Sequence, residues 1–187
     1  GYTTTGLLPG HVLSGVSAGA SGTNVGSYAS NITGTPVIKD ASNNDVTAQY
    51  SITKTNGSLT ITKLNLTITA DSDTKVYDGL PLTKNSYTNT APATGDTITS
   101  VTVTGSQTLE GTSDNTASAA VIKDGAADVT ANYNITYVKG TLTVTKGSIA
   151  LEIKANSDTK VYNGTVQSVS GYTTTGLLPG HVLSGVS

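Results

Sequence analysis

The chain has 187 residues, no cysteine, 12% charged and 35% hydrophobic residues, and a formal net charge of -2. A near-neutral chain without arginine lacks the basic surface expected of a nucleic-acid binder, and no run of about 18 apolar residues is present to cross a membrane. The lack of cysteine excludes disulfides, thiolate nucleophiles and thiolate-bound metals, and it suits an extracellular protein.

Threonine dominates the composition and predicts an all-β protein. The chain contains 35 Thr and 20 Ser, and Val, Ile and Leu alternate with Thr in several stretches. Thr is β-branched, which favours extended backbone, and alternation with period two is typical of a half-buried strand. Because no long stretch spaces its apolar residues three and four apart, we expect no substantial helix.

Internal repeats divide the chain into related modules, which we expect to follow one another as a semi-rigid array. Residues 1–17 return unchanged at 171–187, an offset of 170 residues. The sequence SDTKVYDG at 72–79 returns as SDTKVYNG at 157–164, an offset of 85 residues. A unit of 170 residues therefore contains two related modules.

Residues 1–63 predict an incomplete β-sandwich module whose first strands are missing. The Pro-Gly-His sequence at 9–11 predicts a turn before an alternating strand at 12–16. The Asn-Gly pair at 56–57 lies between two alternating runs, which is typical of a β-hairpin turn. By the repeat pattern, two further strands are expected ahead of this segment.

Residues 64–146 predict one complete module. The apolar positions change between odd and even numbers after Lys63 and again after Lys146. Since side chains alternate with period two, each change marks a bend or a different sheet, and we place the module boundaries there. The strands predicted inside the module are 64–70, 74–77, 84–90, 97–104, 116–123, 128–138 and 140–146. Short strands at this spacing favour tandem Ig-like β-sandwiches, and a β-grasp-like fold is the alternative.

Residues 147–187 predict the opening strands of the next module, at 149–153 and 159–170, followed by the repeated segment. One hypothesis is head-to-tail completion, in which residues 147–170 of one molecule add strands to the incomplete module of the next and a filament grows. Residues 171–187 would then compete with the identical 1–17 for one place. The alternative is that the chain is a window on a longer array, or a fragment of one.

Few residues offer chemistry of their own, and we predict no enzyme. His11 and His181 share one repeat position without a nucleophile motif around them, so we interpret both as loop histidines. Asp71 and Asp73 follow the first strand of the complete module and are candidate calcium ligands. Asn156 replaces the first of these carboxylates in the next copy. No other cofactor is predicted.

An intramolecular isopeptide bond is a further hypothesis, since Lys75 and Lys160 lie near the start of their modules. Such a bond needs a buried amide or carboxyl partner together with an acid. Neither candidate partner recurs, because Gln49 stands at the repeat position of Asn132 and Ser51 at that of Asn134. Surface lysines are the simpler interpretation.

The sequence around the second boundary resembles a known family. The stretch NYNITYVKGTLTVTKGSIALEIKANSDTKVYNG, from Asn132, is similar to the junction between MBG or YDG repeats of bacterial surface adhesins. Within the complete module, GTLTVT at 140–145 and KVYDG at 75–79 carry the resemblance, and Asn163 replaces the Asp in the next copy. The resemblance implies a secreted or wall-anchored protein of the bacterial cell surface, in which such repeats form stalks or adhesive arms.

Two functions stay open for a chain of this kind. The first is a structural spacer or fibre-forming repeat, whose partners are neighbouring repeats of the same protein. The second is a module that binds a host or matrix glycan or protein, which calls for exposed aromatic platforms such as Tyr2, Tyr28 or Tyr87. We favour the spacer because the chain has no Trp and because four tyrosines recur at equivalent places, which indicates structural roles: Tyr50, Tyr77, Tyr133 and Tyr162.

Overall fold

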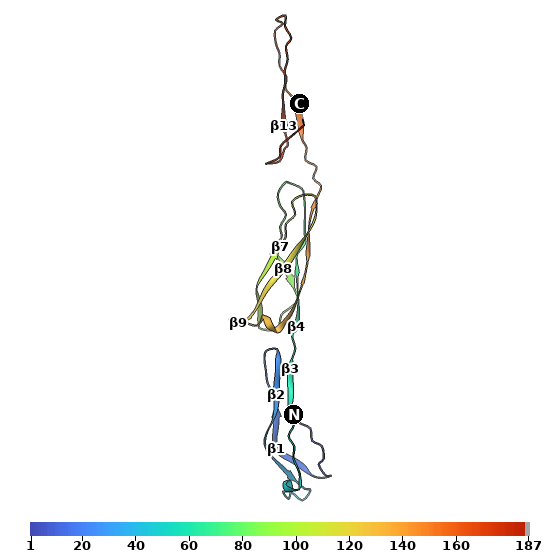
Figure 1. Ribbon diagram of the computed structural model, residues 1–187, viewed down its shortest axis with the longest axis vertical. Coiled ribbons are helices and arrows are strands. Elements are labelled where there is room, and N and C mark those ends of the chain that lie inside the picture. Colours follow the sequence, from blue (N-terminus) through green and yellow to red (C-terminus); the bar gives the residue numbers. More distant parts are fainter. Residues whose placement is uncertain (186–187) are drawn as a thin grey trace. The chain divides into compact units, whose positions relative to one another are not determined.

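The computed structural model describes residues 1–185 and consists almost entirely of β-strands (Figure 1). Strands account for 48% of the residues and helices for 3%. The helical residues form two short 3-10 turns, η1 Thr47–Gln49 and η2 Thr130–Asn132. The predicted all-β class is confirmed, and residues 1–185 contain no helix of the length that a β-grasp fold lays across its sheet.

The strands follow the predicted order along the chain. Their bounds are β1 Val12–Gly19, β2 Gly26–Lys39, β3 Gly57–Ile61, β4 Leu64–Ala70, β5 Asp73–Val76, β6 Tyr87–Asn89, β7 Asp96–Thr104, β8 Gly111–Asp124, β9 Ala127–Asp128, β10 Tyr133–Val138, β11 Gly140–Thr145, β12 Glu152–Ala155 and β13 Tyr172–Thr175. Several predicted strands differ from the observed ones. The strand predicted at 84–90 is limited to β6, the one predicted at 149–153 is β12, and the one predicted at 159–170 was wrong, because these residues form no regular secondary structure. β8 begins five residues earlier than expected, and η2 interrupts the strand predicted at 128–138.

The strands form four sheets. Their orders are β1-β2-β3, β10-β4-β6, β5-β11-β8-β7 with β9 beside β8, and the two-stranded β12-β13. β11 pairs in parallel with β5 and antiparallel with β8. The second and third sheets hold all the strands of residues 64–146, which gives this module the sandwich-like arrangement that the sequence predicted.

Alternate positions of the strands supply the core of residues 64–146. Leu66 and Ile68 of β4 are 1% and 0% exposed, and Leu142 and Val144 of β11 are 0% and 1% exposed. Ile122 of β8 is also fully buried. Because successive side chains of a strand face opposite sides, each strand gives one face to the core and one to solvent.

Each module builds the same turn after its long strand from the same residue types. In the first module, the Thr47 hydroxyl accepts a hydrogen bond from the Ile38 N–H at 2.8 Å, and the Asp45 carboxylate accepts one from the Thr47 N–H at 2.9 Å. Hydrogen bonds from the side chain and backbone of Thr47 hold the pKa of Asp45 below its ordinary value. The same bonds, at the same distances, recur in the second module at Ile122, Asp128 and Thr130.

The contacts divide the chain into two compact units. The first comprises Gly1–Leu66, Ala91–Thr99 and Val121–Ile135, and the second comprises Thr67–Thr90, Ser100–Ala120 and the residues from Thr136 onward. Because these units cut across the repeats, the module boundaries after Lys63 and Lys146 stay predictions. The last two residues of the predicted segment 147–187 lie outside the described residues.

Asn132 helps to hold the first unit together. Its side-chain Oδ1 accepts a hydrogen bond from the Val25 N–H at 2.9 Å, and its Nδ2 donates to the Asn24 side chain at 2.9 Å. These bonds join the turn between β1 and β2 to η2, two segments that are 107 residues apart in the sequence. Asn134, the other side chain that the isopeptide hypothesis considered, donates to the Asn65 side chain at 2.9 Å, so both are engaged in ordinary hydrogen bonds.

Candidate functional site

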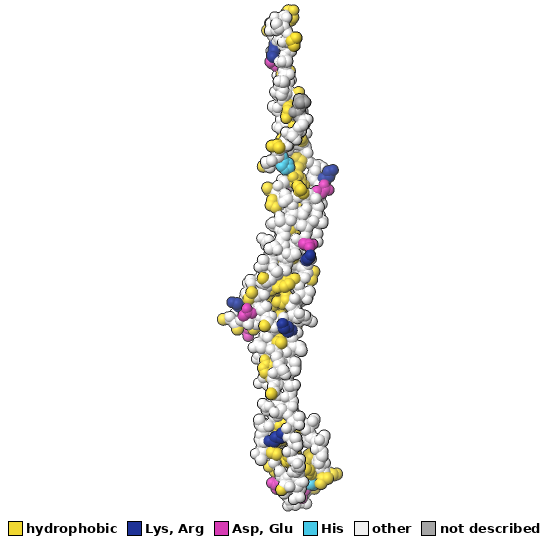
Figure 2. Space-filling view, viewed as in Figure 1, with side chains coloured by type: hydrophobic (Ala, Val, Ile, Leu, Met, Phe, Trp, Pro, Cys, Tyr) yellow, Lys and Arg dark blue, Asp and Glu magenta, His cyan; other side chains and the backbone are white. Residues whose placement is uncertain are grey.

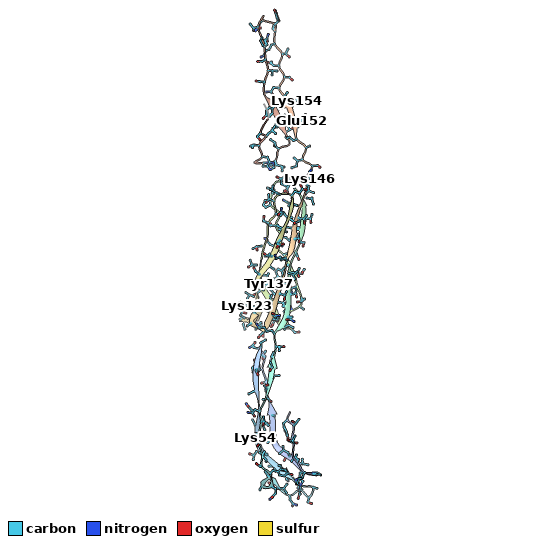
Figure 3. The ribbon with its side chains drawn as sticks, turned by 45° about the vertical axis from the view of Figure 1, so that its right-hand side comes forward. Lys54, Lys123, Tyr137, Lys146, Glu152 and Lys154 are labelled. Carbon is cyan, nitrogen blue, oxygen red and sulfur yellow. The ribbon has the colours of Figure 1, made fainter. Side chains whose placement is uncertain are left out.

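A cavity of about 480 Å³ lies in the module of residues 1–63. Two segments without regular secondary structure line it, residues 2–7 and residues 50–55. β1 and β2 contribute apolar side chains to the lining: Leu13, Val16, Ile32, Pro36 and Ile38. Lys54, labelled in Figure 3, belongs to the second segment, and its ammonium donates a hydrogen bond to the Gly34 carbonyl at 2.7 Å.

The repeat identifies what these two lining segments are. Residues 50–55 correspond to 133–138, which form β10, and residues 2–4 correspond to 87–89, which form β6. In the complete module, β4 lies between β10 and β6 in one sheet. The cavity therefore lies where the complete module holds a strand.

Apolar side chains of the first module are also less buried than their counterparts in the second module. Leu142 is fully buried, but its repeat counterpart Leu59 is 37% exposed. Ile52, which corresponds to Ile135, is 41% exposed. Among the residues described before position 64, Ile38 is the single apolar side chain that is fully buried. The first module thus has strand-forming segments but an open core.

His11 lies at the edge of this module and contacts a tyrosine. Its Nδ1 and the Tyr50 hydroxyl form a hydrogen bond of 2.6 Å, and the two rings meet edge to face. At the same place in the second module, the Tyr133 hydroxyl donates to the carboxylate of Asp96, which stands at the repeat position of His11. Burial and the bond to Asp96 raise the pKa of the Tyr133 phenol. The structure thus gives His11 a packing partner in a turn, the kind of place that the sequence predicted.

His181, the repeat copy of His11, has a different neighbour. Its Nε2 lies 3.2 Å from the Tyr77 hydroxyl, and Leu178 approaches Gly79 in the same region. Tyr77 itself packs against a buried cluster of Leu82, Leu142 and Val144.

The structure places the two candidate calcium ligands in separate hydrogen bonds. Asp71 accepts a hydrogen bond from the Ser86 hydroxyl at 2.6 Å. Asp73 accepts one from the Thr74 N–H at 2.8 Å, and its second oxygen lies 3.8 Å from the Lys84 ammonium. Within residues 1–185, no cluster of three or more His, Asp or Glu side chains could hold a metal ion. The calcium site stays a prediction.

The two candidate isopeptide lysines bond to groups close to them in the chain. Lys75 donates to the Asp78 carboxylate at 2.6 Å and to the Leu80 carbonyl at 2.5 Å. The bond from Lys75 is the main reason that the pKa of Asp78 lies below its ordinary value. Lys160 donates to the Ser168 carbonyl at 2.7 Å. Both lysines therefore stabilise the turn that follows their own segment.

The three tyrosines considered for glycan binding lie in different settings. Tyr2 is 39% exposed and lines the cavity. Tyr28 donates its hydroxyl to the Asn24 carbonyl at 2.7 Å. Tyr87 is half-buried at the start of β6. The structure thus places Tyr2 alone of the three in the lining of this cavity.

Sequence reasoning missed one buried polar residue. Asn115 of β8 is fully buried, and its side-chain amide donates to the carbonyls of Asp71 and Lys84, both at 2.8 Å. It thereby ties the ends of the connection between β4 and β6 to β8. Asn31 stands at the same distance before the repeated VIKD sequence, and this recurrence is the signal that could have pointed to Asn115.

Comparison with known families concerns the second module. Residues 66–143 match the family model described as MBG domain (YGX type), which confirms the resemblance predicted from the sequence. MBG domains are non-catalytic repeat modules that occur in surface proteins. No curated protein and no solved structure matches the chain. In the described part of the chain, no helix is long and apolar enough to span a bilayer.

Proposed function

From the match of residues 66–143 to an MBG domain, we propose that the chain is a structural spacer, a stalk-forming repeat of an extracellular adhesin at the bacterial cell surface or cell wall. The observation that carries this proposal is that the recurring polar residues form hydrogen bonds within the fold. Asp45 and Thr47 hydrogen-bond within their own turn, and their counterparts Asp128 and Thr130 do the same. The polar residues that recur from one module to the next are therefore residues that build the turns of the fold.

The connection between successive strands suits a spacer. β3 ends at Ile61 and β4 begins at Leu64, so only residues 62–63 lie between them. A connection this short leaves little freedom between the strands that it joins. Few charged side chains lie on the visible surface, most of which is backbone or side chains that are neither hydrophobic nor charged (Figure 2), and such a surface suits a segment that separates other parts.

The spacer proposal predicts that the reach of a displayed protein grows with the number of units. Copies of residues 1–170 would be inserted between a cell-surface anchor and a distal epitope, and the height of the epitope would be measured by fluorescence localisation. Each added unit should raise the height by the same amount. A height that does not change with the number of units contradicts the proposal.

Binding is tested separately, with the full chain on an array of host and matrix glycans. The spacer predicts no selective retention, and Tyr2→Ala, Tyr28→Ala and Tyr87→Ala should behave as the unchanged chain does. Selective retention that Tyr2→Ala abolishes and Tyr87→Ala preserves would instead assign glycan binding to the cavity.

A further inference from the structure

The first and the last strands of the complete module lie side by side. We name residues 64–76, which contain β4 and β5, the N-terminal arm, and residues 133–145, which contain β10 and β11, the C-terminal arm. β5 pairs in parallel with β11, in a register that places Asp73 opposite Leu142. β4 lies beside β10 in the neighbouring sheet. The arm that opens the module is therefore paired with the arm that closes it.

One constant separation in sequence relates the two arms. The Thr141 N–H donates a hydrogen bond to the Ser72 hydroxyl at 2.9 Å, and these residues are 69 positions apart. The Asn134 side chain donates to the Asn65 side chain at 2.9 Å, again across 69 positions. The paired residues of β5 and β11 have the same separation. Because the separation stays constant from Asn65 to Val76, both arms run in one direction.

Tension along the chain acts on opposite ends of the paired arms. The chain reaches the N-terminal arm at Leu64, and it leaves the C-terminal arm after Thr145, next to the Lys146 labelled in Figure 3. Because the arms are parallel, a pull on the residues before and after the module acts along the strands. Such a pull loads all the hydrogen bonds between the arms together. A hairpin pulled at its two ends would instead open one bond at a time.

Burial and additional hydrogen bonds strengthen the contact between the arms. Leu142 and Val144 of the C-terminal arm are fully buried. The ladder continues past β5, because the Tyr77 N–H donates to the Thr145 carbonyl at 2.9 Å. The Thr145 hydroxyl also donates to the Lys75 carbonyl at 3.3 Å. Sliding of one arm along the other would break these bonds and bring buried apolar surface into water.

Both arms cross from one sheet to the other at the same place, where a third strand holds them. Asp71 and Ser72 connect β4 to β5, and a Cβ on Gly140, at the start of β11, would clash with the backbone oxygens of Ala70 and Asp71. The buried Asn115 of β8 lies opposite Gly140 and donates its amide to the Asp71 carbonyl at 2.8 Å. One side chain thus fixes the crossing point of both arms.

We propose that the paired arms are a tensile clamp, a set of strand contacts that lets the module carry load along the chain without unfolding. The clamp acts on the rate of unfolding under force, which is a different property from equilibrium stability. The inference goes beyond the spacer role, because a spacer that only sets a distance needs no resistance to force.

The direction of pulling tests the clamp, and a chain without cysteine lets both attachment points be chosen. Optical tweezers pull the full chain through handles on Lys63→Cys and Lys146→Cys, which loads the arms along their length. A second version carries its handles on Leu80→Cys and Lys146→Cys, which both follow the C-terminal ends of paired strands, so the same bonds open in succession. At one pulling speed, the first version should unfold at a force at least about twice that of the second. Leu80 is 64% exposed, so its replacement should leave the module folded, and thermal melts of both versions check this.

Two matched serine variants, measured with handles on Lys63→Cys and Lys146→Cys, separate the clamp from the rest of the module. Both serines are exposed, but Ser72 accepts its hydrogen bond from the C-terminal arm, whereas Ser86 donates to the Asp71 carboxylate. Ser72→Ala should raise the rate of unfolding at constant force about fivefold, because it removes a bond between the arms. Ser86→Ala should leave this rate within about twofold of its original value.

Equal unfolding forces in the two pulling directions would overturn the clamp, and so would equal effects of Ser72→Ala and Ser86→Ala. The spacer proposal fails separately, in the measurement of epitope height, because modules that unfold at low force can still set a distance when no load is applied.

Discussion

Tyr50 and Tyr133 show, at the scale of single residues, how a repeated position keeps its role while its partner changes. Tyr50 pairs with His11, and Tyr133 pairs with Asp96. The recurrence of the tyrosines in the sequence predicted structural roles correctly for these two, but it was wrong for Tyr162, which is 90% exposed. Their partners could not be predicted, because they lie 39 and 37 residues away and differ in chemical type.

Removal of the Tyr133 hydroxyl should destabilise the second module. The hydroxyl donates to Asp96 and accepts a hydrogen bond from the Ala93 N–H at 3.0 Å, and the residue is 4% exposed. Tyr133→Phe leaves a partly buried N–H without its acceptor, which lowers the free energy of unfolding by about 1 to 3 kcal/mol in a urea titration. Tyr162→Phe, at a side chain that is 90% exposed, should change it by less than about 0.5 kcal/mol. Equal losses in the two variants would contradict this assignment.

Four aspartates should make the fold sensitive to acid. Hydrogen bonds from neighbouring groups lower the pKa of each of them in the folded chain: Asp40, Asp45, Asp78 and Asp128. A carboxyl whose pKa is lower in the folded than in the unfolded state stabilises the fold above the unfolded value of about 3.9, and this stabilisation is lost as the pH falls through the folded value.

The melting temperature should therefore stay level from pH 8 to pH 5 and fall below about pH 4. Asp128→Asn should lower it at pH 7 and reduce the difference between pH 7 and pH 3. Thermal melts followed by circular dichroism give both quantities. A melting temperature that rises as the pH falls would contradict this prediction, because protonation of these four carboxylates should destabilise the fold.

At the scale of strands, pairing partners decide where an alternating sequence becomes a strand. Residues 133–138 form β10, but their counterparts 50–55 have no regular secondary structure although the two segments share the Tyr, Ile and Thr at their first, third and fourth positions. β10 has β4 beside it, and no strand occupies that place in the first module. The early start of β8 has a related cause, because Gly111 and Thr112 pair with β11 before the apolar alternation begins. Periodicity therefore predicted the strands of residues 64–146. Their ends, and whether a segment such as 159–170 becomes a strand at all, depended on partners that a local pattern does not contain.

The difference between the two modules predicts opposite responses at one repeat position. Gly140→Ala puts a methyl group against the backbone of Ala70 and Asp71, and it should destabilise the complete module by about 1 to 3 kcal/mol in urea titrations. Gly57→Ala has room for its methyl group and should leave the stability of the free chain within about 0.5 kcal/mol of its original value. A similar loss at both positions would mean that β11 and β3 have the same surroundings.

At the scale of the whole molecule, the repeats were visible in the sequence and the compact units were not. The first unit joins residues 1–66 to two segments of the second module. Asn132 and Asn24 contribute to that unit, and Gln49 stands at the repeat position of Asn132. Contacts made by residues that do not recur leave no trace in a comparison of one module with the next. This is why the repeat pattern predicted the order of the strands in residues 64–146 but not the division into units.

Hydrogen exchange should separate two copies of the same strand. Leu66 and Ile68 of β4 are buried, whereas Leu151 and Ile153 of β12 are more than 40% exposed. Amides of β4 should therefore exchange through global opening, and those of β12 through local opening at a rate at least about a hundredfold higher. Mass spectrometry of peptides from 64–70 and 149–155, in dilute solution, gives the comparison. Equal protection in the dilute chain would contradict the exposure of β12.

The register shared by the pairs β12-β13 and β4-β6 has a consequence for how such a protein is made. In both copies the first strand of the module pairs, in the same register, with a strand that is near it in the chain. Such a local pairing can close during synthesis, before the nearly identical strands of the following module are available. A chain of repeats that share so much sequence is prone to exchange strands between neighbours. Early closure of a local hairpin fixes which strands belong together, and it does so in the order in which they leave the ribosome.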